Sequence, residues 1–182
     1  MTANKVFCGD AAEVLKSLPQ GSANMCVTSP PYYGLRDYGI ENQIGTEQTP
    51  QEYVERLIKV FDEVYRVLMD DGTLWLNIGD SYAGCGKGKG LSQEDNVKDR
   101  PIYDKESKVF SMPNRWENIK PKDLIGIPWM LAFALRERGW YLRSDIIWHK
   151  INALPEAVKD RPAKCYEHIF LLAKSPRYYF DY

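Results

Sequence analysis

A short polar and aromatic segment follows an apolar run near the start of the chain. The run is Met25-Cys26-Val27, and the segment after it is Thr28-Ser29-Pro30-Pro31-Tyr32. Each proline fixes its own φ at about −65°, lacks an N–H and keeps the preceding residue extended. We therefore expect the carbonyls of this stiff strand end to face outward, unused by a helix or a ladder. Beside the Ser29 hydroxyl and the Tyr32 ring, they suit a planar group that carries an amine.

This segment resembles the catalytic motif of amino-group DNA methyltransferases, which move a methyl group from S-adenosylmethionine (SAM) to N4 of cytosine or N6 of adenine. The resemblance implies a site-specific enzyme acting on double-stranded DNA, with catalytic residues Ser29, Pro30, Pro31 and Tyr32. The serine form is more typical of N4-cytosine enzymes, so N4 of cytosine is favoured and N6 of adenine is a close second. The alternative is a Pro-Pro turn that only ends a structural strand.

The expected chemistry is positioning of a weakly nucleophilic amine. The Ser29 hydroxyl and the Pro30 carbonyl would accept its two N–H bonds, so that the nitrogen lone pair can point at the SAM methyl group. A paired base cannot reach such a site, which implies base flipping, with Tyr32 stacked on the flipped base. Ser29 acts here as an acceptor and not as a covalent nucleophile, because no His or Asp is placed by spacing to serve as its base.

Further blocks extend the resemblance over nearly the whole chain. Gly9-Asp10, after Lys5-Val6-Phe7-Cys8, resembles the acidic strand end that contacts the adenosine of SAM. The resemblance thus implies that Asp10, Ala11 and Thr28 bind the cofactor and that no metal is needed. Segment 71–80 resembles the strand that follows the catalytic one, and segments 147–152 and 161–168 resemble later blocks of phage-type and restriction-modification members.

The glycine-rich SAM motif of the family is absent. No G-x-G follows a predicted strand in the 182 residues, and the glycines of segment 84–90 lie among polar residues without a strand or helix context. In permuted members the catalytic motif comes first and the SAM motif last, so the chain resembles an N-terminal half. It is then incomplete, completed by a second polypeptide or a missing C-terminal half, or rearranged. The alternative function is a truncated, non-catalytic DNA-binding fragment. A protein-glutamine or RNA methyltransferase is disfavoured, because the glutamine enzymes favour Asn in place of Ser29.

Hydrophobic periodicity predicts alternating strands and helices. Strands are expected at 5–8, 24–28, 73–78, 141–148 and 166–173, and helices at 10–18, from 49 to about 71, and from about 124 to 138. This order predicts an α/β, Rossmann-like, doubly wound and mostly parallel sheet, in a single partial catalytic domain over residues 1–182. A flexible polar insertion is expected at about 83–120. Asp10, Ser29 and Asp80 fall at strand ends, where ligands gather in such sheets.

Charge is divided unevenly along the chain. Residues 1–83 carry six Lys/Arg and twelve Asp/Glu, and residues 84–182 carry eighteen and thirteen, although the total is −1. DNA binding needs local positive charge and not a basic total. A polar loop after a predicted strand supplies the expected DNA contacts, Lys150, Asn152, Lys159, Arg161 and Lys164; further candidates in the insertion are Lys87, Lys89, Lys98 and Arg100. The alternative for each is a solvated loop residue.

Composition sets the remaining expectations. The apolar runs are far shorter than the ~20 residues of a membrane span, and the first residues lack an apolar signal region. Cys8, Cys26, Cys85 and Cys165 are widely spaced without a C-x-x-C pair, so neither a disulfide framework nor a zinc site is expected. These features predict a cytoplasmic protein, and the family resemblance implies a bacterial or phage-encoded one. His149 and His168 are interpreted as structural.

Overall fold

The computed structural model describes residues 4–84, 118–153 and 155–181. Four of its strands form one sheet, in the spatial order β1-β2-β4-β3. The strands are β1 (Ala23–Thr28), β2 (Leu68–Ile78), β3 (Tyr141–His149) and β4 (Tyr166–Ala173), and the helices are α1 (Ala11–Lys16), α2 (Pro50–Val67) and α3 (Ile127–Glu137). The α/β class is confirmed, as are the predicted helices and all predicted strands except 5–8.

The sheet is mixed. β1 and β2 are parallel, and α2 forms the crossover between them. β4 runs antiparallel to both β2 and β3. β1, β2 and β3 therefore run in the same direction, as expected for a mostly parallel sheet, and β4 is the one reversed strand among those described. This reversal was not predicted; no helix is found between β3 and β4 in the described residues, and the two strands pair directly as an antiparallel pair.

The predicted strand at residues 5–8 is not formed. This segment has no regular secondary structure and joins no sheet within the described part of the chain, and Val6 is 99% exposed. A strand needs a neighbour for its backbone N–H and C=O groups. Among the described strands, β1 pairs only with β2, so its outer edge is open and nothing holds the 5–8 segment beside it.

The core lies between the sheet and two of its helices. α2 begins with a capping box, in which Thr49 accepts from the backbone N–H of Glu52 and the Glu52 side chain accepts from that of Thr49. The buried stripe of α2 packs on alternate residues of β2 and β4; the fully buried members are Tyr53, Leu57, Phe61, Leu74, Leu76, Ile78, Phe170 and Leu172. The bulk of the apolar sequence pattern is thereby explained by packing.

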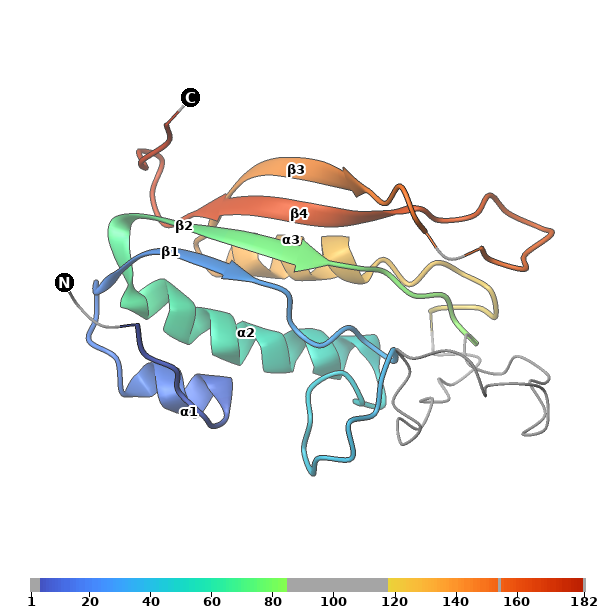
Figure 1. Ribbon diagram of the computed structural model, residues 1–182, viewed down its shortest axis with the longest axis horizontal. Helices are drawn as coiled ribbons and strands as arrows, with labels where there is room; N and C mark the ends of the chain where they lie inside the picture. The colour runs from blue at the N-terminus through green and yellow to red at the C-terminus, as the bar shows by residue number, and fades with distance from the viewer. Residues whose placement is uncertain (1–3, 85–117, 154, 182) are drawn as a thin grey trace.

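The helices cover one face of the sheet, and Figure 1 shows α1, α2 and α3 on the same side of the strands. No described helix covers the opposite face or the outer edge of β1. There Met25 is 56% and Val27 69% exposed. None of the helices described is long and apolar enough to cross a membrane. Most of the expected insertion, with Lys87, Lys89, Lys98 and Arg100, lies outside the described residues.

Candidate active site

The candidate active site lies at the edge where β1, β2 and β3 end and β4 begins. These strand ends and the loops that follow them gather toward the right of Figure 1. Ser29 follows β1 directly, and Asn77 is the penultimate residue of β2. Glu167 is the second residue of β4, and it reaches the same edge because β4 runs in the opposite direction.

Tyr32 joins these strand ends through its hydroxyl group. The hydroxyl lies 2.9 Å from Asn77 Oδ1 and 2.9 Å from Glu167 Oε2. On its other side Ser29 Oγ lies 3.4 Å away and donates to it. The pKa of Tyr32 is raised to about 12, mainly by burial and also by the Glu167 carboxylate, while the Ser29 hydrogen bond opposes the shift. The hydroxyl therefore remains protonated at neutral pH.

Glu167 is held in its ionised form. Burial opposes its ionisation, but hydrogen bonds from Lys150 and Tyr32, together with the Lys150 charge, outweigh burial and lower the pKa of Glu167. Lys150 and Glu167 form an ion pair. The Lys150 side chain, predicted to contact DNA, thus lies against the residues of the candidate active site.

A cavity of about 450 Å³ opens in front of this network. Ser29, Pro30, Tyr32, Lys150 and Glu167 line it, together with residues of the loop that follows β1. This volume lies within the range of small-ligand pockets, which is roughly 300–1,000 Å³. The Ser-Pro-Pro-Tyr segment predicted as catalytic thus borders a cavity whose lining also includes the Lys150–Glu167 ion pair.

The Arg56 side chain of α2 is a main attachment of the loop between β1 and α2, residues 33–49. Arg56 Nη1 donates to the Gln43 carbonyl at 2.9 Å and to the Glu47 carboxylate at 2.8 Å. Leu35, Arg36 and Tyr38 of this loop supply the outer wall of the cavity. Helix α2 therefore determines the position of this wall of the cavity.

One carbonyl of the proline pair is not free. The Tyr53 hydroxyl, from the buried first turn of α2, donates to the Pro31 carbonyl at 2.8 Å. The expectation that these carbonyls are unused is therefore wrong for Pro31. The bond ties the end of β1 to the start of α2, and Pro30 remains the proline whose carbonyl is a candidate acceptor for a ligand.

Two glycines make room for Tyr32. A Cβ atom at Gly79 would lie 2.7 Å from Tyr32 Cε2, and one at Gly45 would lie 2.9 Å from the Tyr32 carbonyl oxygen. Gly45 also has a φ of 104°, which other residues rarely adopt. Neither glycine was singled out in the sequence, because the requirement arises only when β2 and the 33–49 loop meet Tyr32.

A second cavity, of about 460 Å³, lies on the helix side of the same strand end. It brings together Ala11, Thr28 and Ser29, and the rest of its lining is mostly apolar, including side chains of α1 and α2 and of the Pro30-Pro31 pair. Two of the three residues predicted to bind the cofactor therefore share a cavity with a catalytic candidate. The third, Asp10, uses Oδ1 to cap α1 by accepting from the N–H groups of Ala12 and Glu13, at 3.0 and 3.1 Å.

This second cavity fits part of a SAM molecule and not all of it. Its lining offers apolar surface beside Ser29, but no glycine-rich turn at a strand end is present in the described residues to receive the charged end of the cofactor. The other carboxyl predicted at a strand end, Asp80, is likewise used within the protein. It accepts from the N–H groups of Gly126 and Ile127, both at 3.0 Å, and so caps α3.

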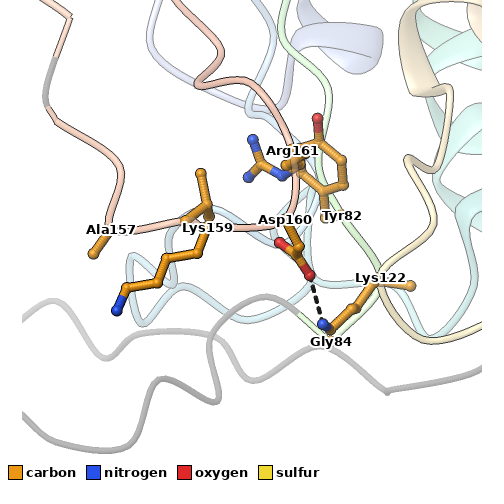
Figure 2. A pocket seen from close by; sticks show the side chains of 9 residues that line it. Tyr82, Gly84, Lys122, Ala157, Lys159, Asp160 and Arg161 are labelled. Atoms are coloured by element: carbon orange, nitrogen blue, oxygen red, sulfur yellow. Dashed lines mark hydrogen bonds and ion pairs between the residues drawn. The ribbon is translucent and has the colours of Figure 1, made fainter.

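Two of the predicted DNA-contact residues, Lys159 and Arg161, line a separate cavity of about 710 Å³ (Figure 2). The Arg161 guanidinium packs on the Tyr82 ring, 3.7 Å from its centroid, and Lys122 forms an ion pair with Asp160 at 2.6 Å. Lys159 is exposed and points away from these two pairs in Figure 2.

The remaining predicted contacts differ in exposure. Lys164 is half-buried with its ammonium 5.4 Å from the Tyr166 ring centroid, and burial lowers its pKa. Asn152 is exposed in the β3–β4 loop. The structure therefore brings together Lys159 and Arg161, whereas Lys150 belongs with the candidate active site.

Sequence reasoning missed Asn77 and Glu167. Both lie in segments that were noted for their resemblance to the family, yet neither was assigned a role. The signal that could have found them is a polar residue at a buried strand end, since Asn77 is next to Ile78 and Glu167 is next to His168. His168 is buried and its Nδ1 lies 2.8 Å from Asp145 Oδ1, consistent with a structural role. The described residues contain no group of His, Cys, Asp and Glu that could hold a metal ion.

A sheet whose strand ends carry a Ser-Pro-Pro-Tyr segment beside a cavity defines the class of amino-group methyltransferases. The family model of DNA methylases of the N6/N4 type matches residues 23–182. The chain belongs to this family.

Related proteins agree with this assignment. The chain is 52% identical over 177 residues to the type II methyltransferase M.Cfr9I of Citrobacter freundii, covering 97% of the chain and 56% of that relative. It is 48% identical over 178 residues to M.SmaI of Serratia marcescens, covering 98% and 58%. The chain thus spans just over half the length of these relatives.

Solved structures show the same fold. A putative DNA modification methylase from Thermus thermophilus, complexed with SAM, aligns with a TM-score of 0.60 at 23% identity, over 96% of this chain and 54% of that one. The cytosine-N4-specific PvuII DNA methyltransferase aligns with a TM-score of 0.61 at 16% identity, over 94% of this chain and 49% of that one.

Proposed function

We propose that the chain forms the catalytic half of a site-specific DNA methyltransferase, which moves the methyl group of SAM to the exocyclic amine of a flipped base. N4 of cytosine is the favoured target, because Ser29 stands where N6-adenine enzymes more often carry aspartate; N6 of adenine is the second candidate. The observation that carries the proposal is the cavity of about 450 Å³ at the end of β1, which Ser29, Pro30 and Tyr32 line together.

In this proposal the cavity holds the flipped base. Ser29 Oγ and the Pro30 carbonyl oxygen accept the two amine hydrogens, and the Tyr32 ring stacks on the base. The gain in rate comes from alignment of the nitrogen lone pair with the methyl group and from oriented acceptors around it. SAM supplies the electrophilic methyl group, and the apolar cavity beside Ala11 and Thr28 receives part of that cofactor.

We further propose that DNA passes over the loops that follow β2 and β3. Lys159 and Arg161 would contact phosphates there, and Lys150, Asn152 and Lys164 stay candidates nearer the base. Lys and Arg neutralise phosphate charge, while Asn can pair with an adenine edge. Stacking on Tyr82 and an ion pair with Glu156 at 2.6 Å hold the Arg161 guanidinium in a fixed plane, and a phosphate contact would compete with that ion pair.

The second candidate is a non-catalytic DNA-binding fragment. It is favoured by the open outer edge of β1, the sheet face without helices, and the absence of the glycine-rich SAM motif from the sequence. A remaining C-terminal half, or a second polypeptide, that adds parallel strands beside β1 would convert such a fragment into the enzyme.

The experiment that separates the two is methyl transfer from labelled SAM to mixed-sequence duplex DNA, followed by digestion to nucleosides and mass analysis. The chain is assayed alone and together with a polypeptide corresponding to the part of the Citrobacter relative that the chain does not cover. We expect N4-methylcytosine, lost in a Tyr32→Ala variant. Transfer only in the mixture supports the catalytic half. DNA binding without transfer in either sample supports the fragment.

A further inference from the structure

We propose that Glu167 sets the direction of the Ser29 hydroxyl through Tyr32, which makes Glu167 and its partner Lys150 positioning residues for methyl transfer. This inference rests on the proposed function. It gives the Tyr32 hydroxyl a role that is separate from stacking by the Tyr32 ring.

The need for such direction follows from the chemistry of a hydroxyl. A serine hydroxyl carries one hydrogen and two acceptor lone pairs, and the hydrogen rotates to suit its surroundings. Ser29 can accept a hydrogen of the target amine only when its own hydrogen points elsewhere. A carboxylate at this position would need no such help, since it has no hydrogen to place. A serine therefore requires a neighbour that accepts its hydrogen in a fixed place.

The contacts around Tyr32 provide that neighbour. The Glu167 carboxylate, ionised beside Lys150, can only accept, so the Tyr32 hydroxyl donates to it at 2.9 Å. Asn77 Nδ2 donates to the His168 carbonyl at 3.2 Å, which turns Asn77 Oδ1, a second acceptor, toward Tyr32. With its hydrogen directed at these two acceptors, the Tyr32 oxygen offers its lone pairs to Ser29.

The Ser29 hydrogen is therefore drawn toward Tyr32. The distance from Ser29 Oγ to Tyr32 Oη is 3.4 Å, which is long for a bond between hydroxyl groups. Hydrogen bonds of this kind are often long in free enzymes and shorten when substrate binds. The result is a one-way chain, from Ser29 to Tyr32 to Glu167, that leaves the Ser29 lone pairs facing the cavity.

Stacking alone and the directed chain predict different effects of removing one oxygen atom. If Tyr32 acts only through its ring, Tyr32→Phe is mild. If the hydrogen bonds from Ser29 through Tyr32 to Glu167 direct the Ser29 hydroxyl, Tyr32→Phe lowers kcat by about 10- to 100-fold while the KM values for DNA and SAM change little. The matched control is Tyr141→Phe, at the exposed start of β3, which leaves kcat unchanged.

Variants at Glu167 test the far end of this hydrogen-bond chain. Glu167→Gln keeps one acceptor oxygen and is expected to retain more activity than Glu167→Leu, which keeps none. The double variant Tyr32→Phe/Glu167→Leu should lower kcat no more than the more damaging of the two single variants does, because both substitutions interrupt the same series of hydrogen bonds. Independent, additive losses, or a Tyr32→Phe variant within about twofold of the original kcat, would overturn the inference.

A measurement on the isolated protein separates this inference from the proposed function. In ¹³C-tyrosine NMR, with Tyr32→Phe used for assignment, Glu167→Gln should move the Tyr32 pKa from its raised value toward the ordinary one, because the carboxylate that raises it is gone. Ser29→Ala should move the Tyr32 resonance at fixed pH. An inactive chain with both NMR changes contradicts only the proposed function. Unmoved Tyr32 signals overturn the inference whatever the activity.

Discussion

Tyr32 is the residue on which the candidate active site depends most. Its hydroxyl joins groups that lie 45 and 135 positions further along the chain, Asn77 and Glu167. Its ring lies against Gly79 and lines the cavity in front of Ser29. A change at this position therefore tests the stacking surface and the network at the same time.

Tyr32→Ala removes the ring on which we expect the flipped base to stack. Stacking contributes ~1–3 kcal/mol per base, so we expect the loss of stacking to lower kcat/KM by roughly 5- to 150-fold. Steady-state methyl transfer to DNA measures this loss, and circular dichroism confirms that the variant is folded. Activity within twofold of the original would show that the ring is not a stacking surface.

Asp80 shows that a carboxyl at a strand end need not belong to the chemistry. Its oxygens accept from the backbone N–H groups at the start of α3, where Gly126 supplies no side-chain cap. Asp80→Ala should lower the free energy of unfolding by about 1–2 kcal/mol, because it leaves these N–H groups without their acceptor. Urea denaturation measures the change. Asp70→Ala is the control, since the Asp70 side chain is fully exposed and its ion pair with Lys174 contributes little.

The elements differ in how well sequence alone predicts them. α2 could be predicted because its N-terminal capping box and its apolar stripe agree with each other. The 5–8 strand could not be excluded, because its apolar residues match a strand and only the missing neighbour prevents pairing. The direction of β4 was missed for a similar reason, since local sequence does not reveal which way a strand enters a sheet.

The residues of the candidate site also differ in how well the sequence predicts them. Ser29, Pro30, Pro31 and Tyr32 form one segment, and their placement beside a cavity could be expected from that segment. The partners of Tyr32 come from two other strands, so they become visible only once β2 and β4 lie next to each other. Pairing of Lys150 with Glu167 likewise depends on the β3–β4 register, in which His149 lies opposite Tyr166.

The capping box of α2 offers a test at the level of an element. Thr49→Ala removes the acceptor for the Glu52 N–H, and we expect a loss of ~1 kcal/mol in the free energy of unfolding. Thr49→Ser keeps the oxygen and should cost much less. Thermal unfolding of the two variants measures the difference. Equal losses in both would indicate that the methyl group and not the hydrogen bond stabilises the helix.

At the scale of the molecule, positive charge is concentrated in the second half of the chain. Neutralisation of Lys159, Arg161 and Lys164 together should flatten the dependence of DNA affinity on salt, because each phosphate contact contributes about 0.9 to the slope on B-DNA. Fluorescence anisotropy at several salt concentrations measures this slope. The matched control neutralises three lysines outside the predicted DNA-contact loop: Lys5 before α1, Lys16 in α1 and Lys59 in α2. If neutralisation of Lys159, Arg161 and Lys164 left the slope unchanged, these DNA contacts would be contradicted.

The open outer edge of β1 has a consequence for the behaviour of the protein in solution. An unpaired strand edge with exposed Met25 and Val27 is a template for pairing with another copy, so the chain by itself should self-associate as its concentration rises. Light scattering over a dilution series should detect this, and Val27→Lys should suppress it without loss of helical signal. A polypeptide that adds a strand to β1 would compete for the same edge, and it would then act as a solubilising partner as well as a structural one.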